Sequence, residues 1–175
     1  MPMLIRFEGG QARAAADPYQ ALDDADPLPV AGDVMVSLAR LLTEGAALAA
    51  RSGRLGVRLG PAEDVLALKP FAGRLDLIAL ELPKFRDGRA YSQARLARER
   101  LGFTGELRAV GEALVEQALI LVRCGFDAVT PADGSAPEAW AAATRRYRHV
   151  YQRAADARDP ASAERLRAPK VGQGA

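Results

Sequence analysis

The sequence predicts an α/β fold: an open parallel sheet of about five strands with helices on both faces, flavodoxin-like or Rossmann-like. Two observations predict it. Short apolar runs alternate with segments whose apolar residues recur at helical spacing, and this strand–helix unit occurs five times in series. Strands joined by crossover helices run parallel, with right-handed connections. Half of a (β/α)₈ barrel is the alternative, because a closed barrel needs about eight such units.

The chain is expected to have three parts. Residues 1–32 contain an N-terminal hairpin and a lead-in loop rich in Asp, Pro and Ala. Residues 33–157 form the α/β domain. Residues 158–175 are polar and interrupted by Pro and Gly, so we expect a mobile C-terminal tail.

Within the α/β domain, the apolar runs predict strands at 34–38, 55–59, 75–82, 106–110 and 127–130. The helical periodicity predicts helices at 38–51, from Pro61 onward, and at 89–101, 113–123 and 135–157. Gly53, Gly102 and Gly125 each follow a predicted helix, where glycine commonly ends one. The run at 75–82 is the clearest strand, since it is mostly apolar, as in a strand covered on both faces.

Composition excludes several classes of protein. The 175 residues are 49% hydrophobic and 26% charged, an ordinary balance for one globular domain. The N-terminus lacks the basic and apolar regions of a signal peptide, and no apolar run is long enough for a membrane helix. We therefore expect a cytoplasmic protein without a membrane partner. The net charge of +2 is small, so nucleic acid is not an expected partner.

Metal, disulfide and dinucleotide chemistry have little support in the sequence. Cys124 is the single cysteine and His149 the single histidine, so no metal site is expected. Cys124 is expected to be buried and inert, and His149 to lie on an exposed helix face. No G-x-G-x-x-G follows a strand, and the cofactor, if there is one, stays unknown. Arg108 lies inside a predicted strand and is expected to form a structural salt link.

The candidate site is the loop that precedes the helix at 89–101. In a sheet of order 2-1-3-4-5, ligands bind beyond the carboxyl ends of the strands where the order reverses. The loop at that point holds five candidate anion-binding residues: Lys84, Arg86, Arg89, Tyr91 and Ser92. Cations beside the free N–H groups of a helix N-terminus favour a small oxyanion or a carboxylate. The alternative is that Asp87 or Ser92 caps the helix and the arginines are only solvated.

One segment resembles a known family. Its parts are Asp87-Gly88-Arg89-Ala90-Tyr91-Ser92-Gln93-Ala94-Arg95-Leu96, Gly102-Phe103-Thr104-Gly105-Glu106-Leu107-Arg108-Ala109-Val110-Gly111 and Arg123-Cys124-Gly125-Phe126-Asp127. They resemble a bacterial domain-of-unknown-function family whose members are commonly described as oxidoreductases probably involved in sulfite reduction. Their genes typically lie beside that of the haemoprotein sulfite reductase. The resemblance covers about residues 30–131 and implies a role in sulfur assimilation, without a motif that assigns a catalytic residue.

Three functions are therefore open. The first is an accessory protein of assimilatory sulfite reduction that binds a small oxyanion at the 84–92 loop. The second is an oxidoreductase with a borrowed flavin or nicotinamide cofactor. The third is a non-catalytic interaction subunit of sulfite reductase. The sequence decides neither whether the protein is an enzyme nor its oligomeric state.

Overall fold

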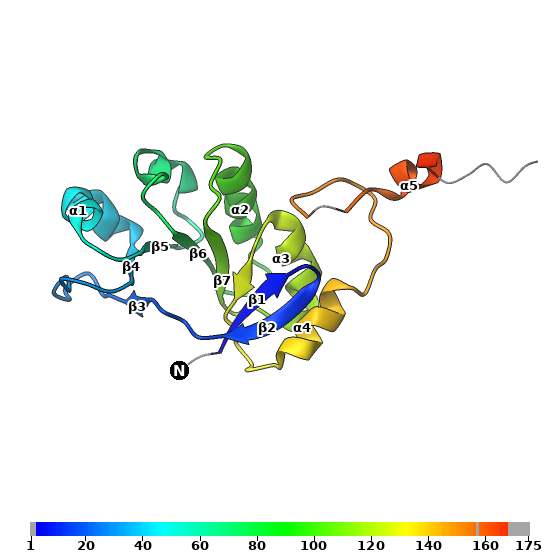
Figure 1. The fold of residues 1–175 in the computed structure, drawn as a ribbon, viewed down its shortest axis with the longest axis horizontal. Helices are drawn as coiled ribbons and strands as arrows, with labels where there is room; N and C mark the ends of the chain where they lie inside the picture. Colours follow the sequence, from blue (N-terminus) through cyan, green and yellow to red (C-terminus); the bar gives the residue numbers. More distant parts are fainter. Residues whose placement is uncertain (1–2, 157, 168–175) are drawn as a thin grey trace, which may run out of the picture.

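The computed structural model describes residues 3–156 and 158–167. Within them, the strands form one eight-stranded mixed sheet of order β2-β1-β8-β7-β6-β5-β4-β3. The sheet is curled and open, and together with its helices it forms a half-barrel (Figure 1). The strands are β1 Leu4–Glu8, β2 Gln11–Ala15, β3 Gln20–Ala21, β4 Val34–Ser37, β5 Leu55–Leu59, β6 Leu77–Leu82, β7 Glu106–Gly111 and β8 Ala128–Val129.

Helices connect most of the parallel strands. The helices are α1 Leu38–Ala50, the 3₁₀ helices η1 Val65–Phe71 and η2 Val115–Gln117, then α2 Arg89–Glu99, α3 Ala118–Cys124, α4 Pro137–Thr144 and α5 Ala161–Arg167. None of them, within the residues the structure describes, is long and apolar enough to cross a membrane.

The strand order corrects the predicted architecture. Strands β3 to β8 lie side by side in chain order, all parallel, whereas the hairpin β1–β2 adds two antiparallel strands beyond β8. Each connection between these parallel strands therefore leads to the neighbouring strand in the same direction along the sheet. Because such connections are right-handed, their helices all lie on the same face of the sheet. The prediction of a doubly wound, five-stranded sheet with helices on both faces was wrong. The half-barrel alternative is confirmed, and no point exists where the strand order reverses.

The hydrophobic core lies between the helices and the outer, convex face of the sheet (Figure 1). Alternate residues of a strand point to opposite faces. In β5 and β6 the residues on the helix side are aliphatic and at most 1% exposed: Leu55, Val57, Leu59, Ile78, Leu80 and Leu82. The intervening positions therefore face the concave side, which the segment between β2 and β4 crosses (Figure 1).

Several helices differ from prediction. The expected helix at Pro61 begins instead as a turn, and only Val65–Phe71 is helical, as a 3₁₀ helix that contains Pro70. The predicted helix at 135–157 ends at Thr144. Arg158 donates hydrogen bonds of 3.2 and 3.1 Å to the carbonyl oxygens of Thr144 and Tyr147. The last carbonyl groups of a helix have no hydrogen-bond partner inside it. Because Arg158 donates to carbonyl groups at and just after the end of α4, these groups stay hydrogen-bonded where the helix stops.

The two ends of the chain agree with prediction in part. The N-terminal hairpin is confirmed, and its β1 strand pairs with β8 through Ile5 and Arg6. The lead-in loop contains the two-residue strand β3, which pairs with β4. The expected C-terminal tail contains helix α5, and its residues 168–175 lie outside the described residues.

Candidate functional site

The carboxyl ends of the parallel strands form one rim of the half-barrel, and this rim carries a polar hollow of about 410 Å³. In (β/α) barrels the ligand site is at this end, because the loops that follow the strands converge there. The polar side chains that line the hollow are Asp23, Asp24, Ser37, Arg58, Glu63 and Glu81. Four carboxylates face one guanidinium, so the hollow repels oxyanions and favours ligands with amino or hydroxyl groups.

Short polar contacts fix the side chains around this hollow. The Ser37 hydroxyl donates to an Asp24 carboxylate oxygen at 2.5 Å and accepts from the backbone N–H of Arg40 at 3.0 Å. Ser37 thereby caps helix α1 and ties the loop after β3 to it. Across the hollow, Arg58 lies 3.1 Å from Glu81 in an ion pair between the ends of β5 and β6. No group of three or more metal-binding side chains is placed to hold an ion within the described part of the chain.

The 84–92 loop lies on the same rim, directly after β6. Helix α2 begins at Arg89, and its N-cap residue Gly88 offers no side-chain cap. Asp87 supplies the anion at this helix entrance: its carboxylate accepts from the backbone N–H of Arg89 at 3.2 Å. The Arg89 guanidinium also pairs with it at 2.6 Å, and this hydrogen bond lowers the pKa of Asp87 to about 2. One of the three cations is thus neutralised within the loop.

The other predicted residues of the loop are separated. Lys84 and Arg86 are exposed to solvent, as is Ser92. Tyr91 turns away from them, because its ring packs edge-on against Phe126 with centroids 6.5 Å apart. Burial there raises the pKa of Tyr91 to about 12. Lys84 and Arg86 remain the exposed cations beside the helix entrance, and Tyr91 belongs to the packing between α2 and the end of α3.

The concave face carries a row of arginines that sequence analysis did not identify as a group. Strand register places Arg58, Ala79, Arg108, Ala128 and Arg6 in one line across β5, β6, β7, β8 and β1. Arginine therefore alternates with alanine on successive strands. In a closed barrel the large side chains of a layer also come from alternate strands, but they are aliphatic. The alternation of charged and apolar residues within β5 and β7 is the signal that could have revealed this row.

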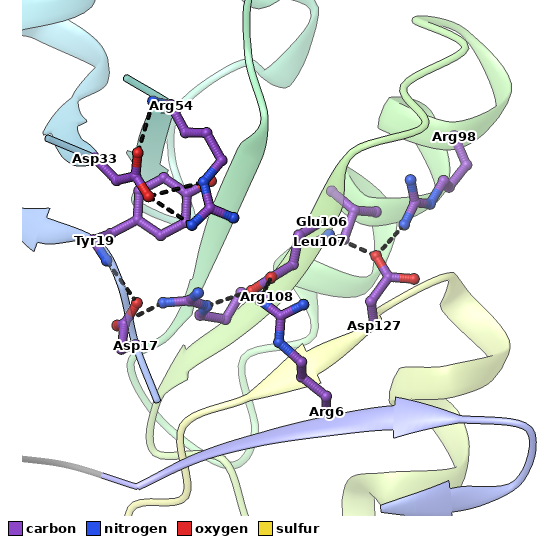
Figure 2. A network of polar contacts seen from close by, with 10 residues as sticks. All are labelled: Arg6, Asp17, Tyr19, Asp33, Arg54, Arg98, Glu106, Leu107, Arg108 and Asp127. Atoms are coloured by element: carbon purple, nitrogen blue, oxygen red, sulfur yellow. Dashed lines mark hydrogen bonds and ion pairs between the residues drawn. The ribbon is translucent and has the colours of Figure 1, made fainter. Parts of the chain in front are cut away.

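Arg108 lies at the centre of the row, with 1% of its surface exposed (Figure 2). Its guanidinium donates to Glu106 and to Asp17, both at 2.7 Å. Glu106 also pairs with Arg6 at 2.5 Å. The Tyr19 ring lies 5.6 Å from the Arg108 guanidinium carbon, in cation–π geometry. The residues around Arg108 thus come from β1, β7 and the lead-in segment, so Arg108 holds that segment on the concave face.

The arginines of the concave face differ in solvent exposure, and a ligand can contact only the exposed ones. Arg108 is enclosed, whereas the Arg58 side chain is 52% exposed at the open rim. Arg54 pairs with Asp33 at 2.6 Å and stacks on the Tyr19 ring, so it contacts the lead-in segment near both of its ends (Figure 2). The carboxyl rim therefore combines polar side chains with an open hollow on this face.

The opposite end of the sheet contains a wider hollow of about 930 Å³ between the β1–β2 hairpin and the segment after α4. Several of its polar side chains, among them those of Arg98, Asp127 and Arg158, are already engaged in the fold. Arg98 donates to the carbonyl oxygens of Phe103, Gly105 and Gly125, and to the Asp127 carboxylate at 2.5 Å. The same carboxylate accepts from the backbone N–H of Leu107 (Figure 2). We interpret this end of the sheet as structural.

Cys124 and His149 lie apart from the rim. Cys124 ends helix α3 and is half-buried, and burial raises the pKa of its thiol. A raised thiol pKa reduces the thiolate fraction that reactive cysteines need. His149 is exposed, with its Nδ1 atom 2.7 Å from Glu164 of helix α5.

The curled sheet, its one-sided helices and its polar concave face define an α/β half-barrel protein. The chain belongs to the family described as bacterial protein of unknown function (DUF934), whose model matches residues 56–162. The matched part runs from β5 through α4 to the start of α5, so it includes Arg58, Glu81, the 84–92 loop and Arg108. No curated protein matches the sequence.

Proposed function

We propose that this protein is an accessory protein of assimilatory sulfite reduction that binds a small oxyanion at the entrance of helix α2. The observation that carries the binding site is the pair of exposed cations, Lys84 and Arg86, beside a helix N-terminus without a side-chain cap on Gly88. Free N–H groups and the helix dipole favour an anion at such a position. The link to sulfite reduction rests on the family resemblance of the segment from Phe85 to Phe126.

The surroundings of the loop suit a site that admits an anion from solvent. Asp87 pairs with Arg89, so Lys84 and Arg86 give the loop a net positive charge. Glu81, which pairs with Arg58, is the nearest carboxylate along the chain on the strand side. Lys84 and Arg86 are exposed, so an anion from solvent can reach both of them.

Calorimetric titration of the purified chain with sulfite, sulfate and phosphate tests the site. We expect heat from at least one anion, and its loss in the Lys84→Ala/Arg86→Ala variant, which removes both exposed cations and leaves the Asp87–Arg89 pair intact. Arg95→Ala/Arg100→Ala is the matched control, because it removes two exposed arginines further along the same helical segment. If no anion gives heat, or if the control loses binding equally, the oxyanion site is wrong.

An interaction subunit of sulfite reductase is the second candidate, favoured by the exposed aromatic and basic side chains around α3 described next. An oxidoreductase with a borrowed flavin or nicotinamide is the third. It predicts a coloured protein, or a thermal shift when either cofactor is added. A colourless protein whose melting temperature neither cofactor changes would exclude it.

A further inference from the structure

We propose that a second surface, formed by helix α3 and residues 145–153, docks an acidic segment of a partner protein that inserts an apolar side chain. We call it the basic–aromatic surface. It consists of Leu119, Ile120, Tyr147 and Tyr151 with the arginines Arg145, Arg146 and Arg148. It needs no contribution from the α2 entrance, so it stands independently of the oxyanion site.

The apolar part of this surface is unusually exposed for its size. Ile120 is 46% exposed, Tyr147 is 61% and Tyr151 is 90%. Hollows of about 370 and 440 Å³ adjoin Tyr147, and both are also lined by Leu119 and Arg123. Buried Ala143 lines one and buried Val150 the other. The two hollows share Leu119, Arg123 and Tyr147 and together form a groove whose lining is mixed, partly polar and partly apolar. A partner's leucine or phenylalanine side chain that packs against its apolar residues would lose contact with water.

The charge around the groove selects an acidic partner. Residues 145–153 contain four arginines and no acidic residue. Beyond Thr144 the chain has eight Lys and Arg against three Asp and Glu, whereas residues 1–144 have 16 against 19. Among the ion pairs of the described residues, Arg153 pairs with Asp159 and His149 with Glu164, while Arg145, Arg146 and Arg148 have no acidic partner. Three guanidiniums are thus available to carboxylates of another molecule.

A protein segment fits this surface better than a nucleic acid. Tyrosine and arginine are enriched where protein interfaces bind most strongly, and an apolar pocket there holds the partner's anchor. Glu116 lines the groove beside Ile120 and would repel the regularly spaced charges of a phosphate backbone. A protein segment can place an uncharged residue there and keep its carboxylates beside the arginines. A partner segment with carboxylates on both sides of one large apolar residue fits this surface. Its apolar residue would occupy the groove, and its carboxylates would pair with the arginines.

Site-specific photo-cross-linking in the native bacterium tests this proposal. Tyr151 is replaced by p-benzoylphenylalanine, and Val30 of the lead-in loop, 91% exposed, carries the same group in the control. Mass spectrometry identifies the cross-linked peptide. We expect Tyr151 to capture one protein through a peptide with more Asp and Glu than Lys and Arg, and Val30 not to capture it.

Binding of that purified partner is then measured with charge-reversal variants whose melting temperature matches that of the unaltered chain. Arg146→Glu/Arg148→Glu should weaken binding at least about tenfold, a loss of about 1.4 kcal/mol. Arg13→Glu/Arg100→Glu, which reverses two exposed charges elsewhere, should change it less than about twofold. The proposal fails if Tyr151 captures nothing above the Val30 control, or captures a nucleic acid, a second copy of this chain, or a peptide without acidic excess. Equal weakening by both variants also overturns it.

Discussion

Arg108 shows how one residue sets the character of the concave face. Its position in the middle of β7 would hold an aliphatic side chain in a closed barrel. Here Asp17 and Glu106 both accept from its guanidinium, which offsets part of the cost of removing the charge from water. Asp17 precedes β3, so the ion pair joins the lead-in segment to β7 in the middle of the sheet. The buried arginine therefore organises the face that a closed barrel would fill with apolar packing.

The variant Arg108→Met tests this structural role. Methionine keeps much of the volume but removes the partner of Asp17 and one of the two partners of Glu106, which keeps its ion pair with Arg6. Because Asp17 is also partly exposed, the cost falls below that of a fully buried broken pair, to about 2 kcal/mol. We expect urea unfolding to show a loss of that size. Arg95→Met, which breaks the exposed pair with Glu99, should leave the free energy of unfolding almost unchanged. Similar losses for both variants would show that the Arg108 pairs do not hold the segment.

A single substitution at Asp87 tests whether the 84–92 loop binds an anion. The hydrogen bond from Arg89 holds the pKa of Asp87 at about 2, so its carboxylate is charged at neutral pH and competes with any added anion. Asp87→Asn removes that charge and frees Arg89. We expect oxyanion affinity to rise modestly, about threefold, because the charge that is removed lies at an exposed and solvent-screened site. Weaker binding in calorimetry would mean that Asp87 orders the site instead of competing for it.

At the scale of the elements, local pattern located most strands and left their arrangement open. The strands at 55–59 and 106–110 were predicted within a residue, because apolar periodicity and glycine stops are local signals. The order of the strands depends on the side of the previous strand on which the next strand is added. The periodicity of the connecting helix does not encode that side. The end of α4 depends on Arg158, 14 residues beyond Thr144, so the sequence predicted a longer helix there.

The same limit applies to the candidate site. The 84–92 loop was identified from its charges, and its place at the carboxyl end of a strand agrees with the structure, although the predicted strand-order reversal does not exist. The pairing of Asp87 with Arg89 was local enough to foresee as a cap. The hollow that joins Asp24, Ser37 and Glu81 was not foreseeable, because it needs three separate loops to meet.

Helix α1 offers a test of how the rim is assembled. Ser37→Ala removes both the cap on the Arg40 N–H and the hydrogen bond to Asp24. We expect a loss of about 1 kcal/mol in the free energy of unfolding, which is typical of an N-cap. Thr43→Ala, on the exposed side of the same helix, should change stability by less than about 0.5 kcal/mol. An unchanged Ser37→Ala variant would show that the cap does not stabilise this rim.

At the scale of the whole molecule, the half-barrel separates three surfaces. The convex face is buried under helices, and the concave face is crossed by the lead-in segment that Arg54 and Arg108 hold. The carboxyl rim carries the polar hollow and the α2 entrance. The basic–aromatic surface around α3 and residues 145–153 adds a positively charged end to a chain whose first 144 residues are slightly acidic. One surface for a small ligand and another for a protein suit an accessory protein.

Growth of a deletion strain tests the central claim, a role in sulfite reduction, most directly. The strain is grown with sulfate, sulfite or sulfide as the sole sulfur source, with and without a plasmid that carries the intact gene. We expect growth on sulfide only, and recovery on all three sources with the plasmid, because sulfide is the product of sulfite reduction. Growth of the deletion strain on all three sources would contradict the proposed role.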